Sequence, residues 1–300
     1  MIDRRHFLGI AGGTLGALAL SSAVGTAFAK SATSVQSKFS AERFARIERA
    51  SGGRLGVAIL DTQTGERCAY RDGERFPMCS TFKFLLATAV LHQVDIGQEQ
   101  LDRRVPIAQS DLVPHAPLAE KRVGQGATVQ ELCEATMIFS DNAAANLLLP
   151  IVGGPTGLTR YLRGIGDSVT RLDRNEPELG TATPGDDRDT TSPRAMVDNL
   201  ERIVLGKVVD AASRERVTDW LKRNTTGDKR LRAGLPKGWT VGDKTGAGAN
   251  GTTNDIAIIW PTGRKPVLIA SYLTQSTLDA DGRNGVHVSV AQELAKSLAS

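Results

Sequence analysis

The apolar positions of the chain form strand-like runs near its two ends and helical patterns between them. Residues 40–50 place apolar side chains at helical spacing, and a Gly-Gly pair ends that pattern. Residues 54–60 form an apolar run, residues 62–65 carry turn chemistry, and residues 66–71 can return antiparallel. This stretch therefore predicts one helix followed by a β-hairpin.

Residues 80–204 have a different character, because helical patterns follow one another with short polar breaks and almost no strand-like alternation. Within this half, Thr128 and Glu131 form a capping box ahead of an apolar run, which predicts the start of a helix. Ser192-Pro193 predicts the start of another helix, and Gly206 should end it.

The segment between these helices, residues 170–191, is rich in Pro, Gly, Asp and Arg. Loops longer than about 12–15 residues are usually functional or disordered, and the charges of this one favour order. Arg174 and Asp189 lie near its two ends and could close it by a salt bridge. For such a pair, two unrelated surface charges are the commoner outcome.

The last part of the chain combines helix and strand signals. Residues 211–223 predict a helix, and a closing helix should pass through Ala291 and Leu298. Between them the strand signals lie at residues 239–243, 255–260 and 266–273. Strands at both ends with helices between them predict an α+β fold, in which the early hairpin and the late strands form one antiparallel sheet.

This layout predicts two lobes with the functional site in the cleft between them. The α/β lobe would comprise residues 36–72 and 222–300, and an inserted all-helical lobe would comprise residues 73–221.

Residues 1–29 have the features of an export signal: a short basic start, an apolar stretch, and a small-residue pattern ending at Ala29. We expect cleavage before Lys30, which leaves residues 30–300 as one functional domain. Arg4-Arg5 resembles the twin-arginine type, whose cargo folds before export to the periplasm. An ordinary secretion signal is the alternative.

Composition excludes several classes of protein. The 300 residues are 40% hydrophobic and carry a net charge of +4, and the bases are scattered among acids, so we expect no nucleic-acid partner. Beyond residue 30 no apolar run approaches the roughly 20 residues that span a bilayer, so no membrane contact is expected after cleavage. The sequence contains no heptad repeat, and a monomer is the default expectation.

The cysteines and histidines argue against a disulfide framework and a metal centre. The three cysteines are an odd number at spacings that match no known framework. The four histidines are far apart and form no metal-binding motif, so we expect no metal and no cofactor.

A serine and a lysine supply the first candidate chemistry. Ser80 and Lys83 are three positions apart at a predicted helix start, which places hydroxyl and amine on one face. The positive end of the helix and a neighbouring cation would lower the pKa of Lys83, so that it could take a proton. One such spacing is expected about once by chance, and no Gly-x-Ser-x-Gly elbow is present. The number of histidines still permits a Ser-His-Asp triad.

Two further motifs change this assessment. Ser140-Asp141-Asn142 follows the helix capped by Thr128, and Lys244-Thr245-Gly246 ends the strand predicted at residues 239–243. Each fixed tripeptide is expected well under about 0.1 times by chance. The three motifs in this order therefore point to one active site.

With these motifs, the chain from about residue 40 onward resembles the class A serine β-lactamases. The resemblance extends to residues 75–83 (Arg-Phe-Pro-Met-Cys-Ser-Thr-Phe-Lys), 174–179 (Arg-Asn-Glu-Pro-Glu-Leu) and 188–191 (Arg-Asp-Thr-Thr). It implies the β-lactamase/transpeptidase-like fold. It also implies that penicillins and cephalosporins are hydrolysed through an acyl-enzyme on Ser80, which confers antibiotic resistance.

The resemblance implies a role for each catalytic group. Ser80 would attack the lactam carbonyl, while the backbone N–H groups of Ser80 and Ala247 would hold the oxyanion. Either Lys83 or Glu176, the latter through a water, would take the Ser80 proton. Ser140 would pass a proton to the lactam nitrogen, and Glu176 would activate the water that clears the acyl group.

The resemblance also implies the residues that bind substrate and shape the site. Asn142 would bond the substrate side-chain amide, and His115 would line the mouth of the cleft. Arg174 and Asp189 would close the 170–191 loop, which corresponds to the Ω-loop of the family. The substrate carboxylate would lie against Arg230 and the motif Lys244, Thr245 and Gly246.

The chain departs from the family pattern at three places. Gly180 stands where most members have an Asn that positions the hydrolytic water, so deacylation could be slower and the site could admit bulkier carbapenems or oxyimino cephalosporins. Family members that bridge the positions of Cys79 or Cys133 have cysteines where this chain has Gly248 and Ala87, so neither bridge can form.

Two alternative functions remain: a penicillin-binding D-Ala-D-Ala peptidase, and a β-lactam receptor that deacylates slowly. Glu176 argues against the peptidase, because the resemblance implies that transpeptidase relatives lack this loop and its glutamate.

Overall fold

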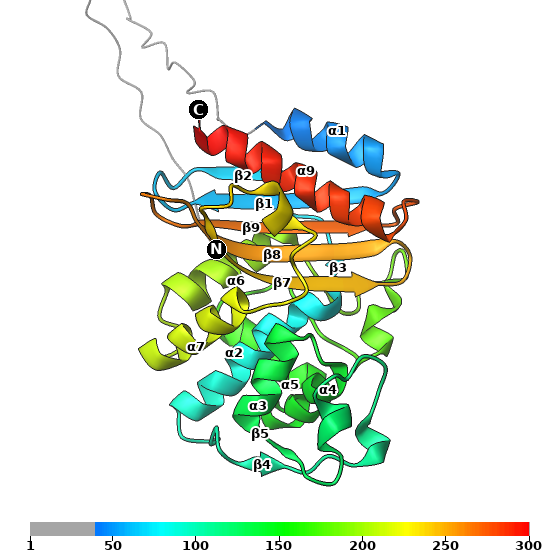
Figure 1. Ribbon diagram of the computed structural model, residues 1–300, viewed down its shortest axis with the longest axis vertical. Coiled ribbons are helices and arrows are strands. Elements are labelled where there is room, and N and C mark those ends of the chain that lie inside the picture. The colour runs from blue at the N-terminus through cyan, green and yellow to red at the C-terminus, as the bar shows by residue number, and fades with distance from the viewer. Residues whose placement is uncertain (1–39, 300) are drawn as a thin grey trace, which may run out of the picture. The chain divides into compact units, whose positions relative to one another are not determined.

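The fold is organised around a five-stranded antiparallel sheet, seen in a computed structural model that describes residues 40–299 (Figure 1). Its strands are β1 (Arg54–Asp61), β2 (Arg67–Tyr70), β7 (Thr240–Gly248), β8 (Thr252–Trp260) and β9 (Val267–Thr274). Their order is β2-β1-β9-β8-β7, so β1 and β9 join the two ends of the chain. This confirms the predicted α+β fold, in which strands from both ends of the chain form one antiparallel sheet.

Both faces of the sheet are covered by helices. On one face Leu55, Val57 and Ile59 pack with α1 (Ala41–Ser51) and α9 (Ala280–Ala299). The alternate positions Ala58 and Leu60 join the core built by the other helices. Because a strand covered on both faces needs apolar residues at every position, β1 has the continuous apolar run of its sequence. Figure 1 shows α1 and α9 on one side of the sheet and α2 to α7 on the other.

The remaining α-helices and the short strands lie between β2 and β7 in the chain. The helices are α2 (Phe82–Asp95), α3 (Val129–Ile138), α4 (Asn142–Leu148), α5 (Gly154–Gly164), α6 (Pro193–Leu200), α7 (Ala211–Lys222) and α8 (Leu231–Gly234). The short strands pair as β3 (Phe76–Pro77) with β6 (Thr190–Thr191), and β4 (Arg104–Val105) with β5 (Ala127–Thr128).

The two helix starts predicted from local chemistry are confirmed. Thr128 Oγ1 accepts the Glu131 amide at 3.1 Å, and the Glu131 carboxylate accepts the Thr128 amide at 2.8 Å. Ser192 caps α6 through the Ala195 amide. A π-helical turn, Glu201–Leu205, continues α6 as far as Gly206.

The predicted strand at residues 239–243 is too short. The strand β7 runs to Gly248, so the Lys244-Thr245-Gly246 motif lies within it and does not end it. The reason is the partner strand, since Lys244 pairs with Ile256 and the ladder continues to Gly248 opposite Thr252. This extension positions the motif as one rigid edge of the sheet.

All three cysteines, Cys68, Cys79 and Cys133, are buried free thiols. Burial raises the pKa of the Cys79 thiol to about 12, which keeps it protonated although it is adjacent to Ser80. Among residues 40–299, none of the helices has the length and apolar character needed to cross a membrane. The predicted export signal, residues 1–29, lies outside the described residues.

A buried histidine joins α9 to the sheet. His287 Nδ1 lies 2.8 Å from Ser271 Oγ, and its Nε2 lies 3.2 Å from the Thr253 carbonyl oxygen. Burial, assisted by the nearby charge of Arg230, lowers the pKa of His287 to about 3. The folded protein therefore holds this imidazole neutral.

We predict that this histidine makes the fold sensitive to acid. An unfolded histidine has a pKa of about 6.5, so between that pH and about pH 3 the unfolded state binds a proton that the folded state does not. Stability is therefore lost as pH falls through this window, by about 3 kcal/mol near pH 4.5 from this group alone.

His287→Gln removes this titration. Urea unfolding near pH 7 and near pH 4.5 should show that the variant loses about 3 kcal/mol less between the two conditions than the unmutated protein. Equal losses in the two proteins would contradict the prediction.

Candidate active site

Ser80 lies in a tight turn that leads into α2. The turn is a 3-10 helix, Cys79–Thr81, and Cys79 has a φ of 45°, a left-handed conformation that costs energy for a non-glycine residue. Asn254 on β8 holds the turn by donating to the carbonyl oxygens of Pro77, at 2.8 Å, and Met78, at 3.0 Å. Strain at this point and the bonds that maintain it mark Ser80 as a functional position.

Lys83 lies one helical turn after Ser80 and is fully buried. Its Nζ donates to Ser80 Oγ at 3.0 Å and to the Ser140 carbonyl oxygen at 2.7 Å. It also donates to Asn142 Oδ1 and lies 3.2 Å from Glu176 Oε1. The Lys83 amine therefore contacts Ser80, Ser140 and Glu176, the groups predicted to take part in proton transfer.

The pKa of Lys83 is lowered, as the sequence predicts, although the main cause is different. Burial of the ammonium accounts for most of the lowering, and the Glu176 carboxylate opposes it. The sequence pointed to the helix end and a neighbouring cation. A lysine with a lowered pKa is neutral more often, and can then accept a proton from Ser80.

Ser140 and Asn142 enter the site because Asp141 fixes the turn between α3 and α4. Asp141 Oδ1 accepts the Ala144 amide at 2.8 Å and caps α4, while Oδ2 accepts the Leu118 amide at 2.9 Å. Ser140 has a φ of 59°, a left-handed conformation like that of Cys79. Both neighbours of Asp141 consequently face Lys83.

Ser140 Oγ bridges two buried lysines. It lies 3.4 Å from Lys83 Nζ and 3.0 Å from Lys244 Nζ. The pKa of Lys244 is well below its ordinary value, because the amine is buried and Lys83 repels it, with partial compensation from Asp243. A hydroxyl between two such amines can pass a proton from one side of the site to the other.

Arg230 lies beside the edge strand β7. Its Nη1 donates to the carbonyl oxygens of Gly246, at 2.7 Å, and Asn254, at 2.6 Å, and its Nε donates to Asn284. The Thr245 hydroxyl bonds that of Thr226. Together with Lys244 these groups make one wall of the site cationic, which suits an anionic ligand.

Glu176 reaches the site from the 170–191 loop. Its Oε1 lies 3.4 Å from Ser80 Oγ, and the residue is 6% exposed. Asn146 on α4 fixes it by accepting the Glu176 amide at 2.9 Å and donating to the Glu176 carbonyl oxygen at 2.8 Å. Asn146 was not predicted from the sequence, although its position four residues after Asn142 places both on one helix face.

Arg174 and Asp189 meet at the base of the 170–191 loop. Arg174 Nε lies 2.6 Å from Asp189 Oδ2, and Asp189 Oδ1 accepts the amides of Asp173 at 2.7 Å and Arg174 at 2.9 Å. Directly after Asp189, Thr190 pairs with Pro77, which connects the loop to the segment that leads to Ser80. The loop is thus tied at its base to the turn it serves.

Gly180 lies on the same loop with free space around its α-carbon. A side chain added there would meet no atom within 4 Å, and its φ is not left-handed. Its carbonyl oxygen accepts the Ala249 amide at 2.9 Å, just beyond the end of β7. The backbone would therefore accept an Asn at this position without strain.

These elements enclose a cleft of about 300 Å³. Its lining residues are Ser80, His115, Ser140, Asn142, Thr226, Arg230, Thr245, Gly246 and Ala247. Three buried residues contact this lining: Lys83 and Glu176 contact Ser80, and Lys244 contacts Ser140. Of the lining residues, Thr226 was not foreseen, because it belongs to no motif and reaches the cleft only through folding.

The arrangement is suited to acyl transfer. A hydroxyl at the cleft surface contacts a buried amine and lies near a buried carboxylate, so its proton has acceptors within reach. A second hydroxyl lies where a leaving group could be protonated, and a cationic wall is available for an anionic substrate.

Comparisons with known proteins agree with this chemistry. Residues 40–298 match the model of a family described as the beta-lactamase enzyme family. The chain is 46% identical over 296 residues to beta-lactamase L2 of Stenotrophomonas maltophilia, covering 97% of this chain and 98% of that protein. It is 48% identical over 256 residues to the carbapenem-hydrolyzing beta-lactamase KPC of Klebsiella oxytoca, covering 85% and 87%.

Solved structures that resemble this chain are also β-lactamases. An ancestral (GNCA) class A beta-lactamase matches with a TM-score of 0.85 and 59% identity, covering 86% of this chain and 99% of that one. A beta lactamase from Xanthomonas campestris matches with a TM-score of 0.84 and 51% identity, covering 86% and 96%.

We predict that Asp189→Asn loosens the 170–191 loop. The substitution keeps an oxygen for the two backbone amides but removes the charge that pairs with Arg174, so the free energy of unfolding should fall by about 1–3 kcal/mol. Amide hydrogen exchange over residues 174–189 should also accelerate. Asp187→Asn, at an exposed position of the same loop, is the matched control. Unchanged exchange in Asp189→Asn would show that the ion pair does not hold the loop.

Proposed function

The chain belongs to the class A β-lactamase family and hydrolyses the β-lactam amide bond, and we propose that Ser80 is the nucleophile of this reaction. The observation that supports this proposal most directly is the contact between Ser80 Oγ and the buried Lys83 amine, at 3.0 Å. A serine needs such a base, because its hydroxyl is a weak nucleophile at its ordinary pKa.

In the acylation step, Ser80 Oγ attacks the lactam carbonyl carbon and its proton passes to a base. Lys83 is in direct contact, and Glu176 could act through a water, so both remain candidates. The backbone N–H groups of Ser80 and Ala247 receive the oxyanion. When the C–N bond breaks, Ser140 gives its proton to the lactam nitrogen and is reprotonated from the lysine side.

In the deacylation step, Glu176 takes a proton from a water that attacks the ester carbonyl. The ester C–O bond breaks, Ser80 recovers its proton, and the ring-opened acid leaves. The support for this assignment is the position of the buried Glu176 carboxylate, 3.4 Å from Ser80 Oγ.

Substrate recognition is assigned to the two walls of the cleft. The substrate carboxylate lies against Lys244, Thr245 and Arg230. Gly246 follows Thr245 on β7, and its carbonyl oxygen accepts Arg230 Nη1 at 2.7 Å. Asn142 bonds the substrate side-chain amide, and His115 lies at the mouth, where its Nε2 is 2.9 Å from the Phe139 carbonyl oxygen. Free space at Gly180 supports a spectrum extended to bulky substrates.

Several wider properties belong to the same proposal. The protein is exported by a twin-arginine signal, cleaved before Lys30, and acts in the periplasm as a monomer with no nucleic-acid partner. It confers resistance to β-lactam antibiotics. We also propose that residues 73–221 form a helical lobe inserted into the α/β lobe, and that the cleft lies between the two. A D-Ala-D-Ala peptidase is not favoured, because the curated relatives reported above are named as β-lactamases.

We predict that Glu176→Gln stops deacylation more than acylation. A general base contributes about 100-fold to 10,000-fold to rate, so the steady-state rate with a chromogenic cephalosporin should fall by that factor while an acyl adduct accumulates on Ser80. Glu178→Gln, an exposed carboxylate on the same loop, should turn over normally. Full activity in Glu176→Gln would exclude Glu176 as the deacylation base.

We predict that Gly180→Asn shifts the spectrum toward penicillins. The added amide occupies free space and can bond the hydrolytic water, so the ratio of kcat/KM for a carbapenem to that for a penicillin should fall by about 10-fold. Gly73→Asn, also in open space and remote from the cleft, is the control. An unchanged ratio would mean that position 180 does not tune specificity.

We predict that changing Arg4 and Arg5 together to Lys stops export, because a twin-arginine signal is recognised by that pair. Immunoblots of periplasmic and cytoplasmic fractions measure the outcome, with Arg46→Lys as the control for a neutral Arg-to-Lys change. Undiminished periplasmic protein would favour an ordinary secretion signal.

A further inference from the structure

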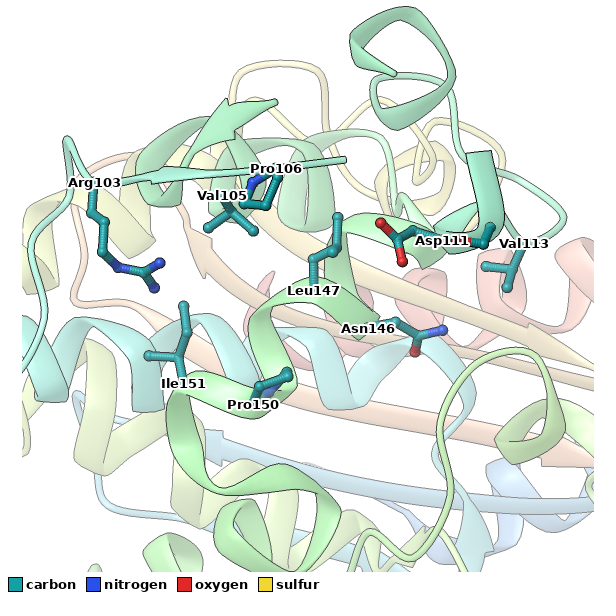
Figure 2. A pocket seen from close by; sticks show the side chains of 10 residues that line it. Arg103, Val105, Pro106, Asp111, Val113, Asn146, Leu147, Pro150 and Ile151 are labelled. Atoms are coloured by element: carbon teal, nitrogen blue, oxygen red, sulfur yellow. The ribbon is translucent and has the colours of Figure 1, made fainter. Parts of the chain in front are cut away.

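A second pocket, larger than the catalytic cleft, lies between β4 with its following turn and the end of α4 (Figure 2). Its volume is about 700 Å³, within the range of small-molecule sites, and it shares no lining residue with the cleft. Its apolar surface comes from Val105, Pro106 and Val113 on one wall and from Leu147, Pro150 and Ile151 on the other.

The charges of this second pocket are not balanced. Arg103 lies at one end, but its Nε and Nη2 already donate to the two carboxylate oxygens of Glu99, at 2.7 Å and 2.5 Å. Asp111 lies toward the opposite end and, within the described part of the chain, forms no ion pair; its Oδ2 accepts only the Ala108 amide, at 2.8 Å. The pocket therefore carries one uncompensated negative charge beside an apolar surface.

Asn146 does not compensate that charge. Figure 2 shows its side chain at the edge of the pocket, and both ends of its amide bond the Glu176 backbone. The polar groups of the second pocket that a ligand can use are therefore the Asp111 carboxylate and the hydroxyl of the exposed Ser110.

We propose that the second pocket binds a small amphiphilic amine, with its apolar body against Leu147 and Ile151 and its ammonium on the Asp111 carboxylate. Charge complementarity selects the cation over an anion, because Arg103 is neutralised and Asp111 is not. The apolar walls select a ligand with a ring or an alkyl body over a bare ammonium ion.

The test is a titration of the ¹⁵N-labelled purified protein with tryptamine, followed by amide chemical shifts. Saturable shifts are expected at Asp111 and Leu147, with a Kd on the order of 1 mM for a ligand of this size. Tryptophol, the neutral alcohol of the same shape, should bind about threefold to fivefold more weakly.

Asp111→Asn keeps an acceptor for the Ala108 amide and removes the charge, so it should abolish the preference for tryptamine over tryptophol. Asp281→Asn, a charge removed from an exposed site on α9, should leave that preference intact. Leu147→Trp should weaken both probes by filling the pocket.

Shifts confined to cleft residues such as Thr245, or an ammonium preference that survives Asp111→Asn, would overturn the proposal. Tighter binding of indole-3-acetate than of tryptamine would assign the pocket to Arg103 and overturn it as well. None of these measurements uses turnover, so this proposal and the proposed roles of the cleft residues can fail independently.

Discussion

The side chains of Lys83, Lys244 and Glu176 are buried close together beside Ser80, and most of the architecture is needed to keep them there. Lys83, Lys244 and Glu176 are almost completely buried, and isolated charges in such a place would cost several kcal/mol each. Each is therefore paired or hydrogen-bonded: the Glu176 carboxylate with the Lys83 amine, and the Lys244 amine with Ser140 Oγ and the Thr245 carbonyl oxygen. The reactive hydroxyl of Ser80 gains its proton acceptors from this arrangement.

The three charged groups come from three different elements, so the fold must hold those elements in fixed positions relative to one another. Lys83 comes from α2, Lys244 from the edge strand β7, and Glu176 from a long loop. Non-glycine residues in left-handed conformations occur at Cys79, directly before Ser80, at Ser140, between α3 and α4, and at Asp189, at the base of the 170–191 loop. Asn254, Asp141 and Arg174 hold these strained points by hydrogen bonds. Strain of this kind is characteristic of functional sites, where surrounding contacts over-determine the backbone.

Sequence reasoning succeeded where the determining interactions are local. The capping box of Thr128 and Glu131 closes within one helical turn, and the spacing of Ser80 and Lys83 places them together in any helix. It failed where a contact depends on distant partners. The length of β7 follows from its ladder with β8, and Asn254 reaches the turn before Ser80 only through the sheet. The lowered pKa of Lys83 was foreseen, but its main cause, burial, is a property of the assembled core.

The central claim is that water clears an acyl group from Ser80, and one experiment measures it directly. The unmutated protein is mixed with excess chromogenic cephalosporin while product is counted, and intact mass is recorded during the run, with peptide mapping of any adduct. We expect product to exceed one equivalent of enzyme and a transient adduct on the peptide that contains Ser80. A burst of one equivalent with a stable adduct, or turnover with an adduct on a different residue, would contradict the account.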